Sequence, residues 1–280
     1  MNAPVRDPSN GRPANSAQGE LRAEFIRAGA RTCVGRTYEA GGLRLRFPRV
    51  SPGAIPGCEA VCINTGGGMV GGDRARLAFA CQADAAVTVT TQSAEKIYRA
   101  EGAPTAIDVS LNLQHGATLE WLPQETILFD RVRLKRSLTA DLTSDATLLL
   151  VESLVFGRLA MGETVSTGLL QDRWRIRRDS RLVFAEELRL EGDIVNQLDR
   201  PALGGGARAF ASLLFVAPEA EARLEEMRDV LSHAPAEAGT SAWNGLLSIR
   251  MASPSPERIR ATIVLLLNRL RGRAAPRVWQ

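Results

Sequence analysis

Short runs of alternating apolar and polar residues, separated by turn residues, fill the chain from residue 43 to about residue 217. Residues 43–47 and 107–113 show the alternation most clearly. Turn signals recur between the runs, at residues 83–84, 115–116, 144–145, 179–180 and 191–193. A period of two is that of a strand with one buried face. Short strands with regular turns therefore predict a mainly β fold rather than alternating strands and helices.

Three of these units resemble one another. Each starts with a turn and continues as an apolar strand: residues 82–89, 114–121 and 143–150. Ala86, Ala117 and Ala146 in these units are 31 and 29 positions apart. Such a period is typical of stacked coils that share one core, as in a β-solenoid. Because hairpins of any antiparallel protein look alike, a stacked two-layer β architecture is an equal alternative.

About two α-helices are predicted near the C-terminus. The first runs from about residue 218 to residue 232 and carries Leu224 and Met227 on one apolar stripe. The second opens with Ser255 as N-cap and Pro256 as its first helical residue, and it stops at Gly272.

The first 20 residues are rich in Pro, Asn, Ser and Gly and contain no apolar stretch. They predict a disordered leader over residues 1–20 rather than a signal peptide, so the protein is expected to be cytoplasmic. Residues 21–280 are expected to form a single domain. The chain has no run of about 18 apolar residues, so no transmembrane helix is expected.

Five glycines stand within seven positions: Gly66, Gly67, Gly68, Gly71 and Gly72. Their spacing matches the G-x-G-x-x-G of dinucleotide sites, but such a site needs a helix directly afterwards, and the residues that follow alternate as a strand. Asp73-Arg74 stands where the Walker motif requires Lys followed by Ser or Thr. The glycines therefore indicate unusual backbone conformations or close approach of another chain segment.

Cysteine and histidine usage argues against a closed metal site. Cys58 and Cys62 form a C-x-x-x-C pair that could supply half of a soft-metal site, but no second pair lies nearby. Buried, reduced thiols are therefore favoured. The chain has two histidines, His115 and His233, so neither a histidine-rich site nor a Ser-His-Asp triad is expected.

The net charge of +4 is carried mainly by arginine. From Arg173 onward, arginines alternate with Trp174 and Ile176, which places the arginines on one face of a strand. Such a face could bind nucleic acid, form a protein interface, or be a solvated face. In the last case its charge is balanced by Glu186, Glu187 and Glu191. No aromatic-interleaved RNA motif is present, so nucleic acid is the least favoured partner.

Three segments carry a resemblance to a known family: residues 63–74, 90–99 and 122–130. The pattern continues through residues 156–163, 172–182, 241–245 and 276–279. In these segments, which span roughly residues 40–280, the chain resembles the urease accessory protein D family (UreD, also called UreH). It departs from the family pattern at Gly67, Glu95 and Ser180, where Ala, Thr and Gly are usual.

The resemblance implies a mostly β, solenoid-like fold and a non-enzymatic scaffold. The expected partners are the urease apoprotein and accessory protein F, and through F the GTPase G, with the metallochaperone E as the nickel source. Two copies of the chain are expected within the accessory complex. No tightly bound cofactor is expected, only nickel in transit, and no nucleic acid or membrane partner.

Nickel in transit needs spaced oxygen ligands that bind weakly enough to release it. The candidates along such a path are Asp73, Ser93, Glu125, Glu152, Glu163 and Glu186. Glu125 and Glu152 are expected at equivalent positions of successive units, where they would line one channel. Arg158 is expected to keep a carboxylate ionised and oriented. Structural or interface roles are expected for the five glycines, Arg158, Arg173 and Trp174.

Each acidic candidate has a structural alternative, namely a solvated side chain or an ion pair with Arg99, Arg158 or Arg181. Two other functions are also open. One is an arginine-rich β protein that binds nucleic acid or an acidic partner and has no metal role. The other is a hydrolase with Glu152 and Glu186 as an acid/base pair, which would need both carboxylates in one pocket about 5–10 Å apart.

Overall fold

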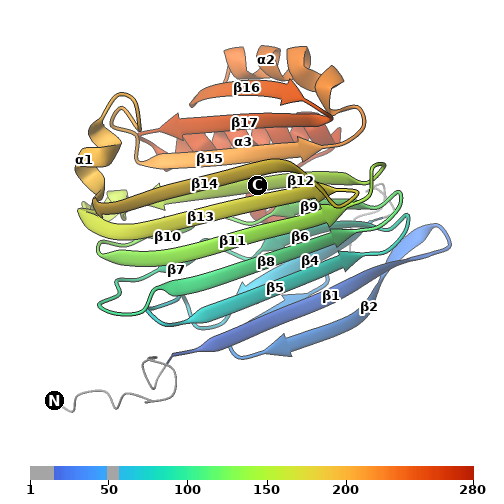
Figure 1. The fold of residues 1–280 in the computed structure, drawn as a ribbon, viewed down its shortest axis with the longest axis horizontal. Helices are drawn as coiled ribbons and strands as arrows, with labels where there is room; N and C mark the ends of the chain where they lie inside the picture. Colours follow the sequence, from blue (N-terminus) through green and yellow to red (C-terminus); the bar gives the residue numbers. More distant parts are fainter. Residues whose placement is uncertain (1–15, 49–56) are drawn as a thin grey trace.

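The computed structural model describes residues 16–48 and 57–280, in which two β-sheets lie face to face (Figure 1). The seven-stranded sheet has the order β14 (Arg181–Asp193), β13 (Thr167–Arg178), β11 (Val132–Leu142), β8 (Thr105–Leu113), β5 (Arg74–Cys81), β1 (Gln18–Ala28) and β2 (Arg31–Ala40). The ten-stranded sheet follows the path β16 (Glu237–Trp243), β17 (Leu246–Ser253), β15 (Ala209–Val216), β12 (Thr147–Phe156), β9 (Thr118–Leu122), β6 (Ala86–Thr91), β4 (Cys58–Asn64) and β3 (Leu43–Arg46). Two short strands, β10 (Thr126–Leu128) and β7 (Glu95–Ile97), continue it beside β12.

Between β4 and β13 the chain alternates between the two sheets, apart from the short strands β7 and β10, which stay in the sheet of the strand before them. Neighbouring strands within each sheet are parallel in this part of the chain. This path is a β-solenoid whose coils share the core between the sheets. The predicted mainly β, solenoid-like architecture is therefore confirmed. Antiparallel strands complete both sheets, namely β2 and β14 at the edges of one and β15 to β17 in the other.

The turns at one end of the solenoid follow the predicted repeat, with a shift of one residue in its first unit. Thr118 N donates to Ala85 O (2.9 Å) and Thr147 N to Ala117 O (2.9 Å). Ala85, Ala117 and Ala146 are all fully buried, whereas Ala86 pairs with Thr118. The alanine equivalent to Ala117 is therefore Ala85 and not Ala86, because successive strand residues point to opposite faces.

Strands β1 and β2 are the largest elements that the sequence pattern did not predict. Residues 1–15, most of the predicted leader, lie outside the described residues, but β1 begins at Gln18 and the leader boundary at residue 20 is too late. Inside β1, Leu21 and Phe25 are buried and Arg22 is exposed, the alternation of a one-sided strand. β1 extends the parallel array by pairing with β5.

Helices cover the outer face of the ten-stranded sheet. α2 (Leu224–Ser232) and α3 (Pro256–Arg271) pack there over a second apolar core, which includes Leu213, Ile249 and Leu266. α3 begins and ends as predicted, since the Ser255 side chain accepts from Arg258 N (3.3 Å) and Gly272 adopts a φ of 61°.

The other helices are short. The first predicted helix is divided into a 3₁₀ turn, Ala220–Arg223, and α2. α1 (Ile194–Asp199) was not predicted, because six residues show no clear helical period. Further 3₁₀ turns lie at Leu159–Met161 and Arg277–Trp279. Among the described residues, no helix has both the length and the apolar character needed to cross a membrane.

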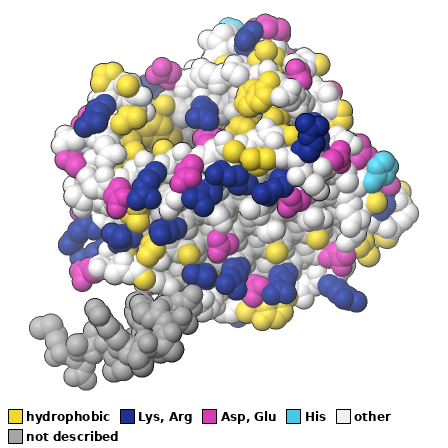
Figure 2. All heavy atoms as spheres, in the orientation of Figure 1, with side chains coloured by type: hydrophobic (Ala, Val, Ile, Leu, Met, Phe, Trp, Pro, Cys, Tyr) yellow, Lys and Arg dark blue, Asp and Glu magenta, His cyan; other side chains and the backbone are white. Residues whose placement is uncertain are grey.

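The outer face of the seven-stranded sheet is free of helices (Figure 1). Figure 2 shows Lys and Arg side chains spread across this face, with Asp and Glu side chains among them. The predicted alternation holds on β13, where Trp174 and Ile176 are buried. Arg173 Nε lies 3.2 Å from Glu187 Oε2, so the arginine row is balanced in part by the next strand. Glu186 and Glu191 pair elsewhere, with Arg250 and Arg189.

Candidate functional site

The long connections of the solenoid all lie at the end opposite the short turns. They join β4 to β5, β6 to β8 and β9 to β11, and they hold the three segments singled out from the sequence. These segments converge on one cavity of about 130 Å³ between the sheets. Its lining includes Gly67, Gly68, Met69, Ser93, Glu95, Lys96, Gln124 and Thr126. Three segments that are separate in the chain thus form a single site.

Backbone hydrogen bonds hold the glycine segment against the next connection. Met69 N donates to Lys96 O (2.8 Å), and Tyr98 N donates to Met69 O (2.8 Å). Asp73 closes the segment, since its carboxylate accepts from Ala17 N (2.7 Å) and Val70 N (2.9 Å). Asp73 is therefore a buried residue that stabilises the loop through hydrogen bonds, and it does not line the cavity.

Two glycines are required for different reasons. Gly68 has a φ of 145°, and a Cβ there would lie 2.5 Å from the Tyr98 ring. Gly71 has no positive φ, but a Cβ would lie 2.5 Å from Ala100 Cβ. Gly68 is needed because its backbone conformation disfavours other residues and because a side chain would clash there. Gly71 is needed only because a side chain would clash.

Valine at either position should destabilise the protein. Gly71→Val should lower the free energy of unfolding by about 1–3 kcal/mol through overpacking. Gly68→Val should cost more, because backbone strain adds to the clash. Urea denaturation of the purified variants measures both effects. Gly102→Val is the control, since a Cβ at Gly102 meets no heavy atom within 4 Å. Normal stability and urease activation with both variants would show that this loop tolerates side chains.

Glu95 lines the cavity from the connection that is hydrogen-bonded to the glycine segment. Asn64 Nδ2 donates to both of its oxygens, at 3.0 and 3.1 Å, and Lys96 N donates at 3.2 Å. Burial raises the pKa of Glu95 above its ordinary value, while the Asn64 amide and Lys96 oppose the rise. The sequence drew attention to Glu95 as a departure from the family pattern but did not place it in the site.

Glu95→Gln should change the pH dependence of stability. Because the folded-state pKa of Glu95 is raised, the folded chain binds this proton more tightly than the unfolded chain. Its contribution is thus most favourable below the unfolded pKa and is lost as pH rises through the folded pKa. Glu95→Gln should therefore be more stable than the wild type at neutral pH, with a gap that closes towards pH 4, as measured by urea denaturation. Glu101→Gln in the exposed loop is the control. A stability difference between Glu95→Gln and the wild type that does not change with pH, or that equals the difference for Glu101→Gln, would contradict this.

Deeper between the sheets, Arg136 joins two carboxylates. Its guanidinium donates to Asp172 (Nε–Oδ1 3.0 Å, Nη2–Oδ2 2.5 Å) and, on the other side, to Glu152. Trp121 Nε1 donates to the second oxygen of Glu152 (2.8 Å). The side chains of Arg136, Glu152 and Asp172 are 3%, 5% and 8% exposed. Inside an otherwise apolar core, these groups are retained only because each is paired.

Arg136 and Glu152 affect each other's pKa values, and Asp172 affects both. Burial alone would lower the pKa of Arg136, but Asp172 and Glu152 raise it above the ordinary value, so the guanidinium stays protonated. Burial raises the pKa of Glu152, and the charge of Arg136 opposes that rise.

A second cavity of about 50 Å³ adjoins the first, since Arg136 and Glu152 line both. It continues past Asp172 to Glu186 on the edge strand β14. Glu186 Oε2 lies 3.0 Å from Arg250 Nη2 of β17, in the opposite sheet. Burial raises the pKa of Glu186, and Arg250 opposes the rise. We call the polar side chains that line the two cavities the interior row; it includes Ser93, Glu95, Arg136, Glu152, Asp172 and Glu186. Arg136 lies where the two cavities meet.

Three of the six predicted ligands fall on this row, namely Ser93, Glu152 and Glu186. Glu125 does not, contrary to the expectation that it shares a channel with Glu152. Thr126 faces inward beside Arg136, so alternation turns Glu125 outward, 3.5 Å from Arg260.

Of the predicted structural residues, Gly67 and Gly68 line the first cavity and Trp174 the second, whereas the predicted ligand Glu163 and its neighbour Arg158 lie off the row. Glu163 is paired with Arg158, whose guanidinium stacks 4.7 Å from the Phe129 ring centre. Arg158 therefore orients Glu163 and none of the interior acids. The arginine that pairs with Glu152 is Arg136.

Arg136 and Asp172 were missed by the sequence reasoning, although a signal was present. Both occupy inward positions of strands whose other inward residues, such as Leu134 and Trp174, are apolar. They also pair directly in the parallel register of β11 and β13. A charged residue in the buried phase of a strand predicts a partner of opposite charge in the neighbouring strand.

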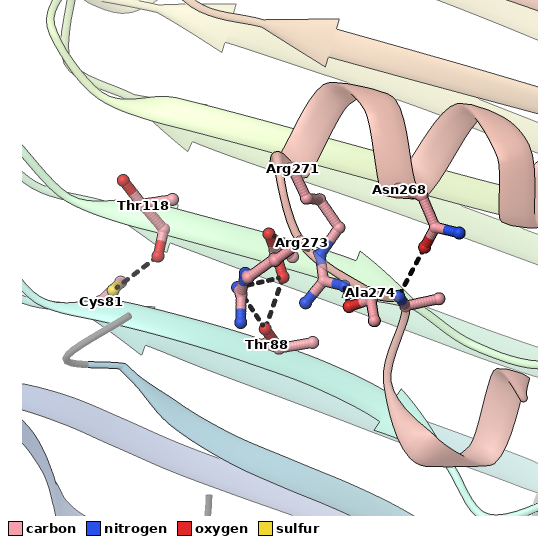
Figure 3. A network of polar contacts seen from close by, with 9 residues as sticks. Cys81, Thr88, Thr118, Asn268, Arg271, Arg273 and Ala274 are labelled. Carbon is pink, nitrogen blue, oxygen red and sulfur yellow. Dashed lines mark hydrogen bonds and ion pairs between the residues drawn. The ribbon is translucent and has the colours of Figure 1, made fainter. Parts of the chain in front are cut away.

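Figure 3 shows a separate polar network on the outer face of the ten-stranded sheet, with Arg271 and Arg273 turned towards Thr88. Buried Glu120 accepts from Arg271 Nε (2.9 Å) and Arg273 Nη2 (3.0 Å), which anchors the end of α3 on β9. This network fixes the C-terminal residues on the sheet and does not reach the interior cavities.

The thiols and histidines contribute no compact metal site. Burial raises the pKa of Cys58 to about 11 and that of Cys62 to about 12, so both stay neutral thiols. His115 is exposed beside Asp145, and His233 is exposed at the end of α2. In residues 16–48 and 57–280, no three His, Cys, Asp or Glu side chains gather in an arrangement that could hold a metal ion.

Comparison with known proteins gives a consistent result. The model of the family described as UreD urease accessory protein matches residues 17–280. The urease accessory protein UreD of Azorhizobium caulinodans is 44% identical over 263 residues, which cover 94% of this chain and 96% of that protein. The UreD proteins of Rhodopseudomonas palustris and Xanthobacter autotrophicus are each 46% identical, over 95% and 94% of this chain and 94% and 90% of their own lengths.

Proposed function

This chain belongs to the UreD urease accessory protein family and has its role in urease maturation, and we propose that it is a non-enzymatic scaffold through which nickel passes to the enzyme. The supporting observation is that Arg136 and Glu152 line two adjoining interior cavities at once. Together the cavities lead from the glycine-rich connections to Glu186 at the sheet edge.

The chemistry of this row suits a cation in transit. Glu95, Glu152, Asp172 and Glu186 offer oxygen ligands in sequence. A path of separate weak sites lets an ion enter and leave, whereas a closed cage would retain it. Arg136 pairs with Glu152 and Asp172 where the two cavities share lining residues, and we propose that nickel replaces the guanidinium as their counter-charge when it passes.

The proposed partners follow from the family. The chain binds apo-urease and accessory protein F, and F links it to the GTPase G, with the metallochaperone E as nickel source. Two copies of the chain act within the accessory complex in the cytoplasm. The chain itself holds no resident cofactor, because nickel is its cargo.

Co-expression tests the scaffold directly. We expect more soluble chain when F is co-expressed than when the chain is expressed alone, since F covers surface that is otherwise exposed. Affinity purification of the tagged chain should then retain F, and apo-urease when that is supplied. The measurements are soluble yield and the stoichiometry of the purified complex. Equal yield with and without F, together with no stable complex, would contradict the scaffold function.

A further inference from the structure

An open groove of about 720 Å³ lies beside the interior cavities, at the end of the solenoid that carries the long connections. The same segments line both features. In the glycine segment, Met69 faces the cavity and Val70 the groove. In the next connection, Lys96 lines the cavity and Tyr98 the groove. Whatever occupies the groove therefore sits next to one end of the interior row.

The floor of the groove is apolar and aromatic. The rings of Tyr98 and Phe129 pack with centroids 4.7 Å apart, and Val70 is 47% exposed beside them. Tyr98 is fixed in place, since its hydroxyl donates to Gly67 O (3.1 Å). Rigid aromatic rings next to arginine are the groups that most often dominate protein–protein binding energy.

The acidic residues of the groove are already engaged. Asp130 accepts from Ser166 N (2.7 Å), Ser166 Oγ (2.6 Å) and Thr167 N (3.2 Å), which fixes the opposite wall. Glu163 is paired with Arg158. Both carboxylates therefore stabilise the walls of the groove through contacts within the chain.

One cation of the groove has no acidic partner among the described residues, and a second has only a long ion pair. Arg99 is exposed, and its side chain makes no ion pair or hydrogen bond with any residue in 16–48 or 57–280. Arg131 Nε lies 3.9 Å from Asp130 Oδ2, beyond hydrogen-bond distance, and the side chain is 56% exposed. The groove therefore offers the unpaired charge of Arg99 and the largely exposed charge of Arg131 above an apolar floor.

We propose that this groove docks a partner protein through an acidic segment that carries an aromatic or branched aliphatic side chain. The apolar side chain packs on Tyr98, Phe129 and Val70, and the flanking carboxylates pair with Arg99 and Arg131. The charge complementarity selects an acidic segment over a basic one. The inference rests on the proposed function only for the partner's identity, and it places that partner beside the interior row.

The double reversal Arg99→Glu/Arg131→Glu tests the groove. The probe is a fluorescent peptide of about ten residues with a central tryptophan between acidic residues, compared with its Asn/Gln counterpart. Wild-type chain should bind the acidic peptide and not the neutral one, and the reversal should weaken binding roughly tenfold or more. Arg76→Glu/Lys135→Glu on the outer sheet face is the control, since both side chains are exposed there and the charge change is equal.

The same variants are then assayed against purified F and apo-urease separately. The reversal should weaken one of these complexes, and the control should leave both unchanged. Unaltered binding of the peptide and of both partners would overturn the groove proposal while leaving the scaffold function intact. If the wild type binds neither partner, the scaffold function fails and the peptide result alone decides the groove. Self-association that the reversal abolishes would assign the groove to a second copy and overturn the proposal.

Discussion

Replacing Arg136 with Met should lower the free energy of unfolding by about 3–5 kcal/mol, the usual cost of removing one partner from a buried ion pair. Methionine fills much of the same space, so the loss reflects charge more than volume. Glu152 and Asp172 would remain at 5% and 8% exposure without their common counter-ion. The measurement is urea denaturation at neutral pH. The cost should shrink in acid, where the two carboxyl groups can protonate.

Two comparisons separate this charge effect from ordinary substitution. Arg173→Met breaks an exposed pair with Glu187 and should cost less than about 1 kcal/mol. Arg136→Met combined with Glu152→Gln and Asp172→Asn removes the unpaired charges and should recover part of the lost stability. A loss in Arg136→Met as small as that in Arg173→Met would show that the interior row is solvated and that Arg136 is not its anchor.

The fold was largely predictable because its signals are local. Turn residues and alternation located the strands of the solenoid, and Ser255, Pro256 and Gly272 marked α3 at both ends. β1 lies outside the predicted strands although its alternation is clear, because the polar composition of the N-terminus continues to residue 20, past the start of the strand. Which strands become neighbours depends on closure of the whole coil, and no single segment contains that information.

The site was less predictable for a physical reason. Sequence alone identified Glu152 as a charge in an apolar strand but not the residue that pairs with it. Arg136 and Asp172 are 36 residues apart and meet only through the register of β11 and β13. Arg158 was named instead because it lies near in sequence, and it pairs with its neighbour Glu163. The partner of a buried charge is better predicted from which face of its strand each residue occupies than from closeness in sequence.

The central claim is that nickel passes along the interior row, and the double variant Glu152→Gln/Glu186→Gln addresses it. Gln preserves volume and removes two of the row's charges, while Asp172 still pairs with Arg136. We therefore expect the variant to fold and to assemble with F and apo-urease. Nickel delivery should fall strongly, because a cation in transit loses two of its oxygen ligands and their compensating charge.

Glu187→Gln/Glu191→Gln is the matched control, since these two acids lie on the same strand β14 but on its outer, solvated face. The decisive measurement is nickel per urease active site after maturation, taken alongside pull-down of the complex. The interior path predicts normal assembly with reduced nickel for the Glu152/Glu186 variant and wild-type nickel for the control. Wild-type nickel loading by the Glu152/Glu186 variant would contradict the path, and loss of assembly would reassign both residues to structure.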